Sequence, residues 1–223
     1  MSKGEIMEYL QILGKTYQCN IIRENIKRVY IQYKENVVII KCPKRMKDND
    51  ILNIIENNEI KIAKIINKVN NKVNYSYENG SEIPFYGQKL KIIYSNELLI
   101  RNGYMYLDAR NPKESYNLLA KKYGEIFYKE RINYFITKYN LPYKVNKIVI
   151  REMKTRYGVC NIRDKKITFQ THLAVYPLEC IDYVIVHELS HFKVQNHSKE
   201  FYYEVAKILP DYKIRQKRLK EIY

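Results

Sequence analysis

The segment VIVHELSHFKVQNHSKEF, residues 184–201, most constrains the fold, because it places three of the chain's four histidines in or beside an apolar stretch. Val184, Leu189 and Phe192 give its first part the character of a helix that packs in a protein core. Polar side chains that are buried without partners cost several kcal/mol. The chain must therefore adopt a fold that provides partners for these histidines.

The spacing of two of these histidines is typical of a metal site. His187 and His191 are four residues apart, so on a helix their imidazoles project from one face and can bind one ion together. Glu188 lies about 100° around the helix from His187, where it can act on a water at the metal without being a ligand. The motif H-E-x-x-H thus predicts half of a zinc hydrolase site. The alternative is a pair of core histidines hydrogen-bonded to the backbone, with a glutamate on the surface.

A third ligand is needed, since catalytic zinc sites usually take three protein ligands and leave the fourth position to water. We favour His197, which follows a predicted helix break and lies just before the start of another helix. Glu200 and Glu204, one and two turns into that next helix, are the competing ligands. The prediction is one Zn2+ per chain on His187, His191 and His197, although three imidazoles also suit iron, cobalt or nickel.

The N-terminal half of the chain has the alternation typical of β-strands. Apolar and polar residues alternate over 29–33, an apolar run follows at 37–40, and alternation returns over 90–106. Between these strands, apolar residues at helical spacing predict one helix over 48–69. We therefore expect residues 1–112 to form a β-rich lobe with a covering helix.

The pattern changes at Pro112, a residue that suits the first turn of a helix. Residues 113–140 are predicted to form one long amphipathic helix, and strands are predicted at 147–151 and 166–170. The histidine helix and two further helices follow. Residues 113–223 thus form a second lobe of helices with a small sheet. We expect an α+β protein whose two lobes pack as one unit.

The chain is strongly basic, with 40 Lys and Arg against 24 Asp and Glu and a formal net charge of +16. A positive surface attracts polyanions, which indicates non-specific contact with nucleic acid; the alternative is an ordinary solvated surface in a lysine-rich chain. No apolar stretch approaches the roughly 20 residues that span a bilayer, and the N-terminus lacks the pattern of a signal peptide. We expect a cytoplasmic protein without a membrane partner, and its oligomeric state stays open.

Four motifs in this order resemble those of the YgjP-like metallopeptidase proteins, which are relatives of the SprT-like zinc proteases. The motifs are TRYGVCN at 155–161, IDYVIVHELSHF at 181–192, NHSKEFY at 196–202 and PDY at 210–212. The stretch YGQKLKI at 86–92 is also similar, so the resemblance extends over nearly the whole chain.

The resemblance implies a zincin-like catalytic lobe that hydrolyses a peptide or protein substrate. In it, Glu188 is the catalytic base that activates water, and the zinc ligands are His187, His191 and His197. Two alternatives stay open. One is a DNA-associated SprT-like protease that is recruited through the basic surface, and the other is a latent zinc-binding module without activity.

Arg156 and Tyr157 in the TRYGVCN stretch are further candidates. If this stretch borders the metal, either side chain can orient a peptide or stabilise an oxyanion. The alternative is a strand that ends in a glycine turn at Gly158, with Arg156 on the surface. The family usually has tryptophan and serine where this chain has Tyr157 and Val159, so the side chains that would meet a substrate differ here.

Overall fold

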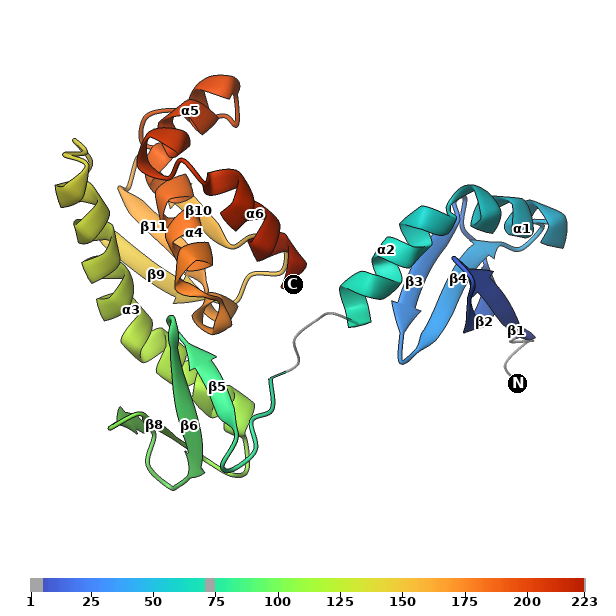
Figure 1. Ribbon diagram of the computed structural model, residues 1–223, viewed down its shortest axis with the longest axis horizontal. Coiled ribbons are helices and arrows are strands. Elements are labelled where there is room, and N and C mark those ends of the chain that lie inside the picture. Colours follow the sequence, from blue (N-terminus) through green and yellow to red (C-terminus); the bar gives the residue numbers. More distant parts are fainter. Residues whose placement is uncertain (1–5, 71–74, 223) are drawn as a thin grey trace. The chain divides into compact units, whose positions relative to one another are not determined.

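The computed structural model describes residues 6–70 and 75–222 of the chain (Figure 1). The chain divides into two compact units, Met1–Val73 and Asn74–Ile222, which are called the first and the second unit below. Within the described residues, no helix is both long and apolar enough to cross a membrane.

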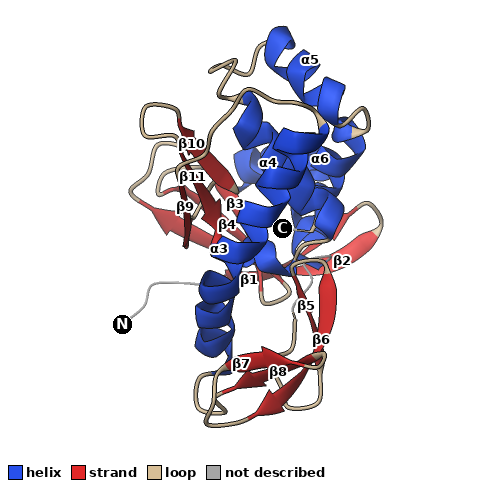
Figure 2. Ribbon diagram, turned by 90° about the vertical axis from the view of Figure 1, so that its left-hand side faces the viewer, coloured by secondary structure: helices blue, strands red, loops and turns tan. Residues whose placement is uncertain are grey.

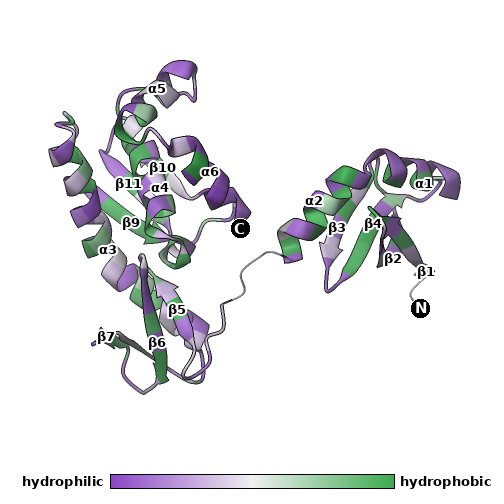
Figure 3. Ribbon diagram, in the orientation of Figure 1, coloured by the Kyte–Doolittle hydropathy of each residue, from purple (hydrophilic) through white to green (hydrophobic). Residues whose placement is uncertain are grey.

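The first unit is a four-stranded sheet with strand order β1-β2-β4-β3, followed along the chain by two helices. The strands are β1 (Ile6–Ile12), β2 (Lys15–Glu24), β3 (Tyr30–Lys34) and β4 (Val37–Pro43), and the helices are α1 (Asp48–Asn57) and α2 (Glu59–Asn70). Alternate side chains of β4 are buried, and Figure 3 colours much of this strand as hydrophobic. They pack with apolar side chains of both helices, and this core includes Val38, Ile40, Ile51, Ile55, Ile62 and Ile66.

The helix predicted over 48–69 is interrupted at Asn58. The side-chain amide of Asn58 donates a hydrogen bond to the Ile54 carbonyl at 2.8 Å, and its backbone N–H donates to the Ile55 carbonyl at 3.0 Å. The second helix then begins at Glu59. Asparagine side chains compete for backbone hydrogen bonds in this way. The apolar periodicity continues across the break and therefore did not reveal it.

The second unit begins with another four-stranded sheet, of strand order β5-β6-β8-β7. Its strands are β5 (Glu82–Phe85), β6 (Gln88–Tyr94), β7 (Leu99–Arg101) and β8 (Tyr104–Leu107), and the long helix α3 (Pro112–Lys138) follows. Pro112 stands in the first turn of α3. The long helix predicted over 113–140 is therefore present with nearly the same bounds.

The lobe boundary predicted at residue 112 lies inside the second unit. The hydroxyl of Tyr86, which follows β5, donates to the Ala120 carbonyl on α3 at 2.8 Å. The backbone N–H of Tyr86 donates to the Ala174 carbonyl at 2.7 Å. Because these contacts join segments that are far apart in the sequence, the β5–β8 sheet belongs to the second unit, and the chain divides ahead of β5.

The rest of the second unit consists of a three-stranded sheet and the C-terminal helices. These elements are β9 (Lys147–Arg151), β10 (Gly158–Asn161), β11 (Lys166–Gln170), the 3-10 helix η1 (Thr171–Val175), α4 (Leu178–Ser190), α5 (Lys199–Ile208) and α6 (Tyr212–Glu221). The central strand β11 is parallel to β9 and antiparallel to β10, so β10 lies at an edge. Figure 2 shows this sheet beside α3 and α4. The α+β class and the strands predicted at 147–151 and 166–170 are confirmed, whereas the glycine turn considered at Gly158 is the start of strand β10.

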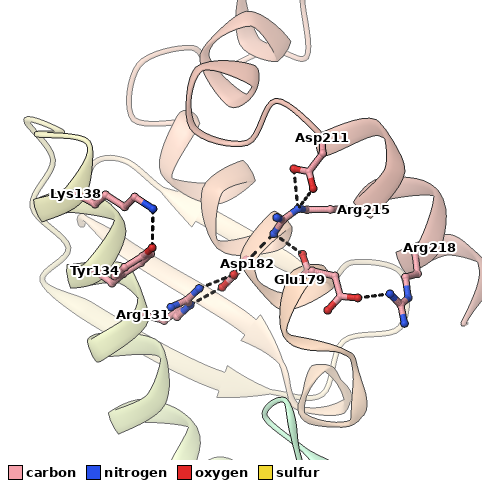
Figure 4. Close-up of polar contacts among 8 residues, drawn as sticks. All are labelled: Arg131, Tyr134, Lys138, Glu179, Asp182, Asp211, Arg215 and Arg218. Carbon is pink, nitrogen blue, oxygen red and sulfur yellow. Dashed lines mark hydrogen bonds and ion pairs between the residues drawn. The ribbon is translucent and has the colours of Figure 1, made fainter.

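Charged side chains join α4 to α3 and α6 (Figure 4). Asp182 on α4 is buried and accepts hydrogen bonds from Nε and Nη2 of Arg131 on α3, both at 2.6 Å. Arg215 on α6 lies 3.8 Å from the same carboxylate, and Arg218 pairs with Glu179. Bidentate pairs between arginine and carboxylate fix geometry as well as adding energy. The helix α6 is therefore held against α4, the helix that carries His187.

Candidate metal centre

The histidine segment lies where α4 ends and the chain turns back. Helix α4 ends at Ser190, and His191 is its C-cap residue. Helix α5 begins after Ser198, whose side-chain oxygen accepts a hydrogen bond from the backbone N–H of Phe201 at 3.4 Å. The chain reverses direction between these two helices, at the predicted helix break, and His197 therefore lies next to His187 and His191.

The three histidines form one cluster. Their metal-binding ring nitrogens all lie within 4.8 Å of one another, and Nε2 of His187 is 3.0 Å from Nε2 of His197. Nδ1 of His191 lies 3.1 Å from the Val194 carbonyl oxygen. When this Nδ1 donates its hydrogen to the carbonyl, Nε2 of His191 is left as the nitrogen that can bind a metal.

The two competing ligands lie outside this cluster. Glu204 on α5 forms ion pairs with Lys193 at 3.1 Å and Lys207 at 2.8 Å. The hydrogen bond from Lys207 is the main reason why the pKa of Glu204 is lowered. Glu200, in the first turn of α5, is exposed. Among the residues that the structure describes, no carboxylate joins the histidine group.

The chemistry of the cluster fits a divalent cation. Burial lowers the pKa of His187 to about 3, with a contribution from the two neighbouring imidazoles, and burial also lowers the pKa of His191. Both rings are therefore neutral at pH 7, the state in which imidazole binds a metal. The facing Nε2 atoms of His187 and His197 suit a cation of the size of zinc, which binds nitrogen at about 2.0 to 2.1 Å.

Phe201 contacts all three imidazoles from within α5. Phe201 is 0% exposed, and its ring centroid lies 4.8, 4.6 and 4.8 Å from those of His187, His191 and His197. We did not predict this role from the sequence. The signal was the position of Phe201 four residues after His197, at the start of the apolar face of the next helix.

Glu188 lies on the side of α4 that faces β10. Glu188 is 4% exposed, and burial raises its pKa to about 8. Two weaker effects lower the pKa of Glu188, namely a hydrogen bond from the backbone N–H of Cys160 and the positive charge of Arg156. A cation held by the histidines would lower it further. The predicted base is therefore a buried carboxylate on the helix that carries His187 and ends at the C-cap residue His191.

One cleft of about 570 Å³ contains the histidine cluster and Glu188, and this volume is in the usual range of ligand sites. Its walls come from β10, α4 and α6 and the residues that adjoin them. Arg156 lines the cleft and is exposed. Tyr157 also lines it, and its hydroxyl donates to the Leu219 carbonyl on α6 at 3.2 Å. Both predicted substrate-contact residues thus lie at the cleft, and Tyr157 in addition joins the start of β10 to α6.

The chain is similar to known metallopeptidases. Two solved structures that are similar to part of the chain are the metallopeptidase zymogens of Pyrococcus abyssi abylysin and Methanocaldococcus jannaschii jannalysin. The first is 26% identical over 43% of this chain and 87% of its own, with a TM-score of 0.36. The second is 26% identical over 40% and 95%, with a TM-score of 0.33. No curated protein matches the chain. The family model described as YgjP-like, metallopeptidase domain matches residues 27–222, and the chain therefore belongs to this family.

Proposed function

We propose that the chain hydrolyses peptide bonds in peptides or unfolded proteins with one zinc ion held by His187, His191 and His197. The observation that carries the proposal is the convergence of three imidazoles and one buried carboxylate in a single cleft. Three protein ligands leave a fourth position for water or substrate, as in catalytic zinc sites. A structural zinc site is normally closed by four protein ligands, and the described residues offer three.

Zinc at this position would supply Lewis acidity, which makes water more acidic and polarises the scissile carbonyl. Glu188 is the proposed general base, which takes a proton from the attacking water and delivers it to the leaving amine. Its burial keeps the carboxylate away from bulk solvent. Arg156, which is exposed at the cleft, is proposed to orient the substrate or to stabilise negative charge on the carbonyl oxygen. Tyr157 is a second proposed substrate contact.

The proposal is tested with Glu188→Gln, which keeps the shape of the side chain and removes its ability to accept a proton. Tag-free wild type and E188Q are compared for zinc content and for cleavage of a quenched peptide library and an unfolded protein. We expect equal zinc content and a loss of roughly 100- to 10,000-fold in the rate of hydrolysis.

Glu200→Gln is the matched control, because Glu200 is an exposed carboxylate of α5 outside the histidine group. E200Q should hydrolyse the same substrates at the wild-type rate. An E188Q protein that cleaves as fast as wild type would refute the role of Glu188. A wild-type protein that holds one zinc and cleaves none of the substrates would instead support a latent zinc-binding module.

A further inference from the structure

Gly158, the first residue of β10, lies directly against the side chain of Glu188. A Cβ atom added at Gly158 would lie 2.6 Å from Oε1, 2.7 Å from Cγ and 2.8 Å from Cδ of Glu188. All three distances are below 3.0 Å, and Cβ atoms in proteins essentially never lie so close to a heavy atom of another residue. The side chain of Glu188 therefore occupies the space that any residue other than glycine would need.

The backbone conformation does not by itself require glycine here. The glycines with a positive φ among the described residues are Gly14, Gly80, Gly87 and Gly103, and Gly158 is not one of them. An alanine could adopt the extended conformation of this strand without strain. The need for glycine at this position thus comes from the contact with Glu188.

The same strand also holds the carboxylate by a hydrogen bond. Cys160, two residues after Gly158, donates its backbone N–H to Glu188. The Tyr157 carbonyl accepts a hydrogen bond from the Gln170 N–H of β11 at 2.9 Å. Because hydrogen-bonding residues alternate along an antiparallel pair, Gly158 and Cys160 direct their peptide groups away from β11.

The edge of β10 that does not pair with β11 therefore meets Glu188 at two residues. Gly158 leaves room for the Glu188 side chain because it has no Cβ atom, and the backbone N–H of Cys160 donates a hydrogen bond to Glu188. A rotation of the carboxylate alone would not make room for a side chain, since Cγ and Cδ of Glu188 are as close to the added Cβ as Oε1 is. Glu188 is buried, so its whole side chain would have to take another rotamer in a packed environment.

We infer that Gly158 is a positioning residue for Glu188: the edge strand β10 sets the place of the carboxylate beside the histidine cluster, and a side chain at position 158 displaces it. The expected effect of Gly158 on catalysis rests on the proposed function, in which Glu188 is the general base. The contact itself is independent of activity, so it can be tested separately.

The first test is a double-mutant cycle of thermal unfolding with Gly158→Ala, Glu188→Ala and the double variant. All three atoms that the new Cβ would meet are removed by E188A. In the wild-type background, G158A should lower the Tm by roughly 3 to 10 °C, as expected for overpacking in a chain of this size. In the E188A background, the same change should leave the Tm within about 1 °C.

Gly124→Ala is the matched control for this cycle. A Cβ at Gly124 on α3 would meet the hydroxyl of Tyr86 and Cγ1 of Ile150 instead of Glu188. G124A should therefore lower the Tm equally with and without E188A. A G158A chain that folds only when E188A is also present would support the inference in the same way as the Tm values.

The second test measures function and zinc in the G158A protein. We expect zinc content equal to wild type, a kcat lower by roughly 100-fold and a KM that changes little, because a misplaced base weakens the chemical step and leaves binding intact. The inference is overturned if G158A lowers the Tm by the same amount in both backgrounds, or if G158A hydrolyses at the wild-type rate. If wild type itself hydrolyses nothing, the proposed function fails while the Tm cycle still decides whether Gly158 and Glu188 interact.

Discussion

Substitution of Phe201 by alanine should weaken the fold and the metal site together. The ring is completely buried and its centroid lies within 5 Å of the centroids of all three imidazoles. A buried Phe→Ala change costs about 3 to 5 kcal/mol. Phe201 also contacts the ring of Tyr202, so the rings of four neighbours surround it. We therefore expect Phe201→Ala to lower the free energy of unfolding by about 4 kcal/mol and the Tm by roughly 8 to 16 °C in a chain of this length.

The same change should lower zinc affinity, since groups that support metal ligands are worth about 10- to 100-fold in affinity. The assay is a competition titration of zinc-free protein against a chromophoric chelator, at a temperature where both proteins are folded. If F201A does not fold, Phe201→Leu replaces it, because a swap between hydrophobic residues of similar volume costs less than about 1.5 kcal/mol.

Phe135→Ala is the matched control. Phe135 on α3 is 2% exposed and contacts the rings of Tyr134 and Tyr139 and the guanidinium of Arg131, none of which belongs to the histidine cluster. F135A should lose a similar free energy of unfolding and bind zinc like wild type. F201A with wild-type zinc affinity would refute the reasoning, as would F135A with an equal loss of affinity.

Two predictions concern charged groups outside the histidine cluster. Asp182→Asn should lower the free energy of unfolding by about 2 kcal/mol in urea, because it weakens the partly buried pair with Arg131; a loss below roughly 0.5 kcal/mol would contradict this. For Glu204, hydrogen bonds from Lys207 and Lys193 hold the pKa below 4.5, so its stabilising effect is full above pH 4.5 and is lost as the pH falls through the lower pKa of the folded state. The difference in free energy of unfolding between wild type and Glu204→Gln should therefore shrink below pH 4.5, and a difference independent of pH would contradict it.

Local patterns were sufficient to predict several parts of this protein. The strands at 147–151 and 166–170 have the predicted bounds, and α3 differs from its predicted bounds by at most two residues, because alternation and helical spacing act within one element. The reversal that brings His197 back to α4 was also predicted, since a helix break and a new N-cap are local signals.

Contacts between distant segments account for two features that the sequence did not reveal. The division ahead of β5 depends on hydrogen bonds of Tyr86 with Ala120 and Ala174, which join segments far apart in the sequence. The role of Gly158 appears only when β10 lies against α4, since Glu188 is remote from it in the sequence. A single sequence shows which residue types are present, but such pairings arise from the packing of elements on one another.

The zinc content of the chain tests the central claim most directly. Wild type and His197→Ala, both purified without a histidine tag from zinc-replete cultures, are measured by mass spectrometry of the metal. The account predicts about one zinc per wild-type chain and little in H197A, because two imidazoles do not make a stable catalytic site. A wild-type protein without metal under these conditions would contradict the account, since His187, His191 and His197 would then lie together without an ion to share.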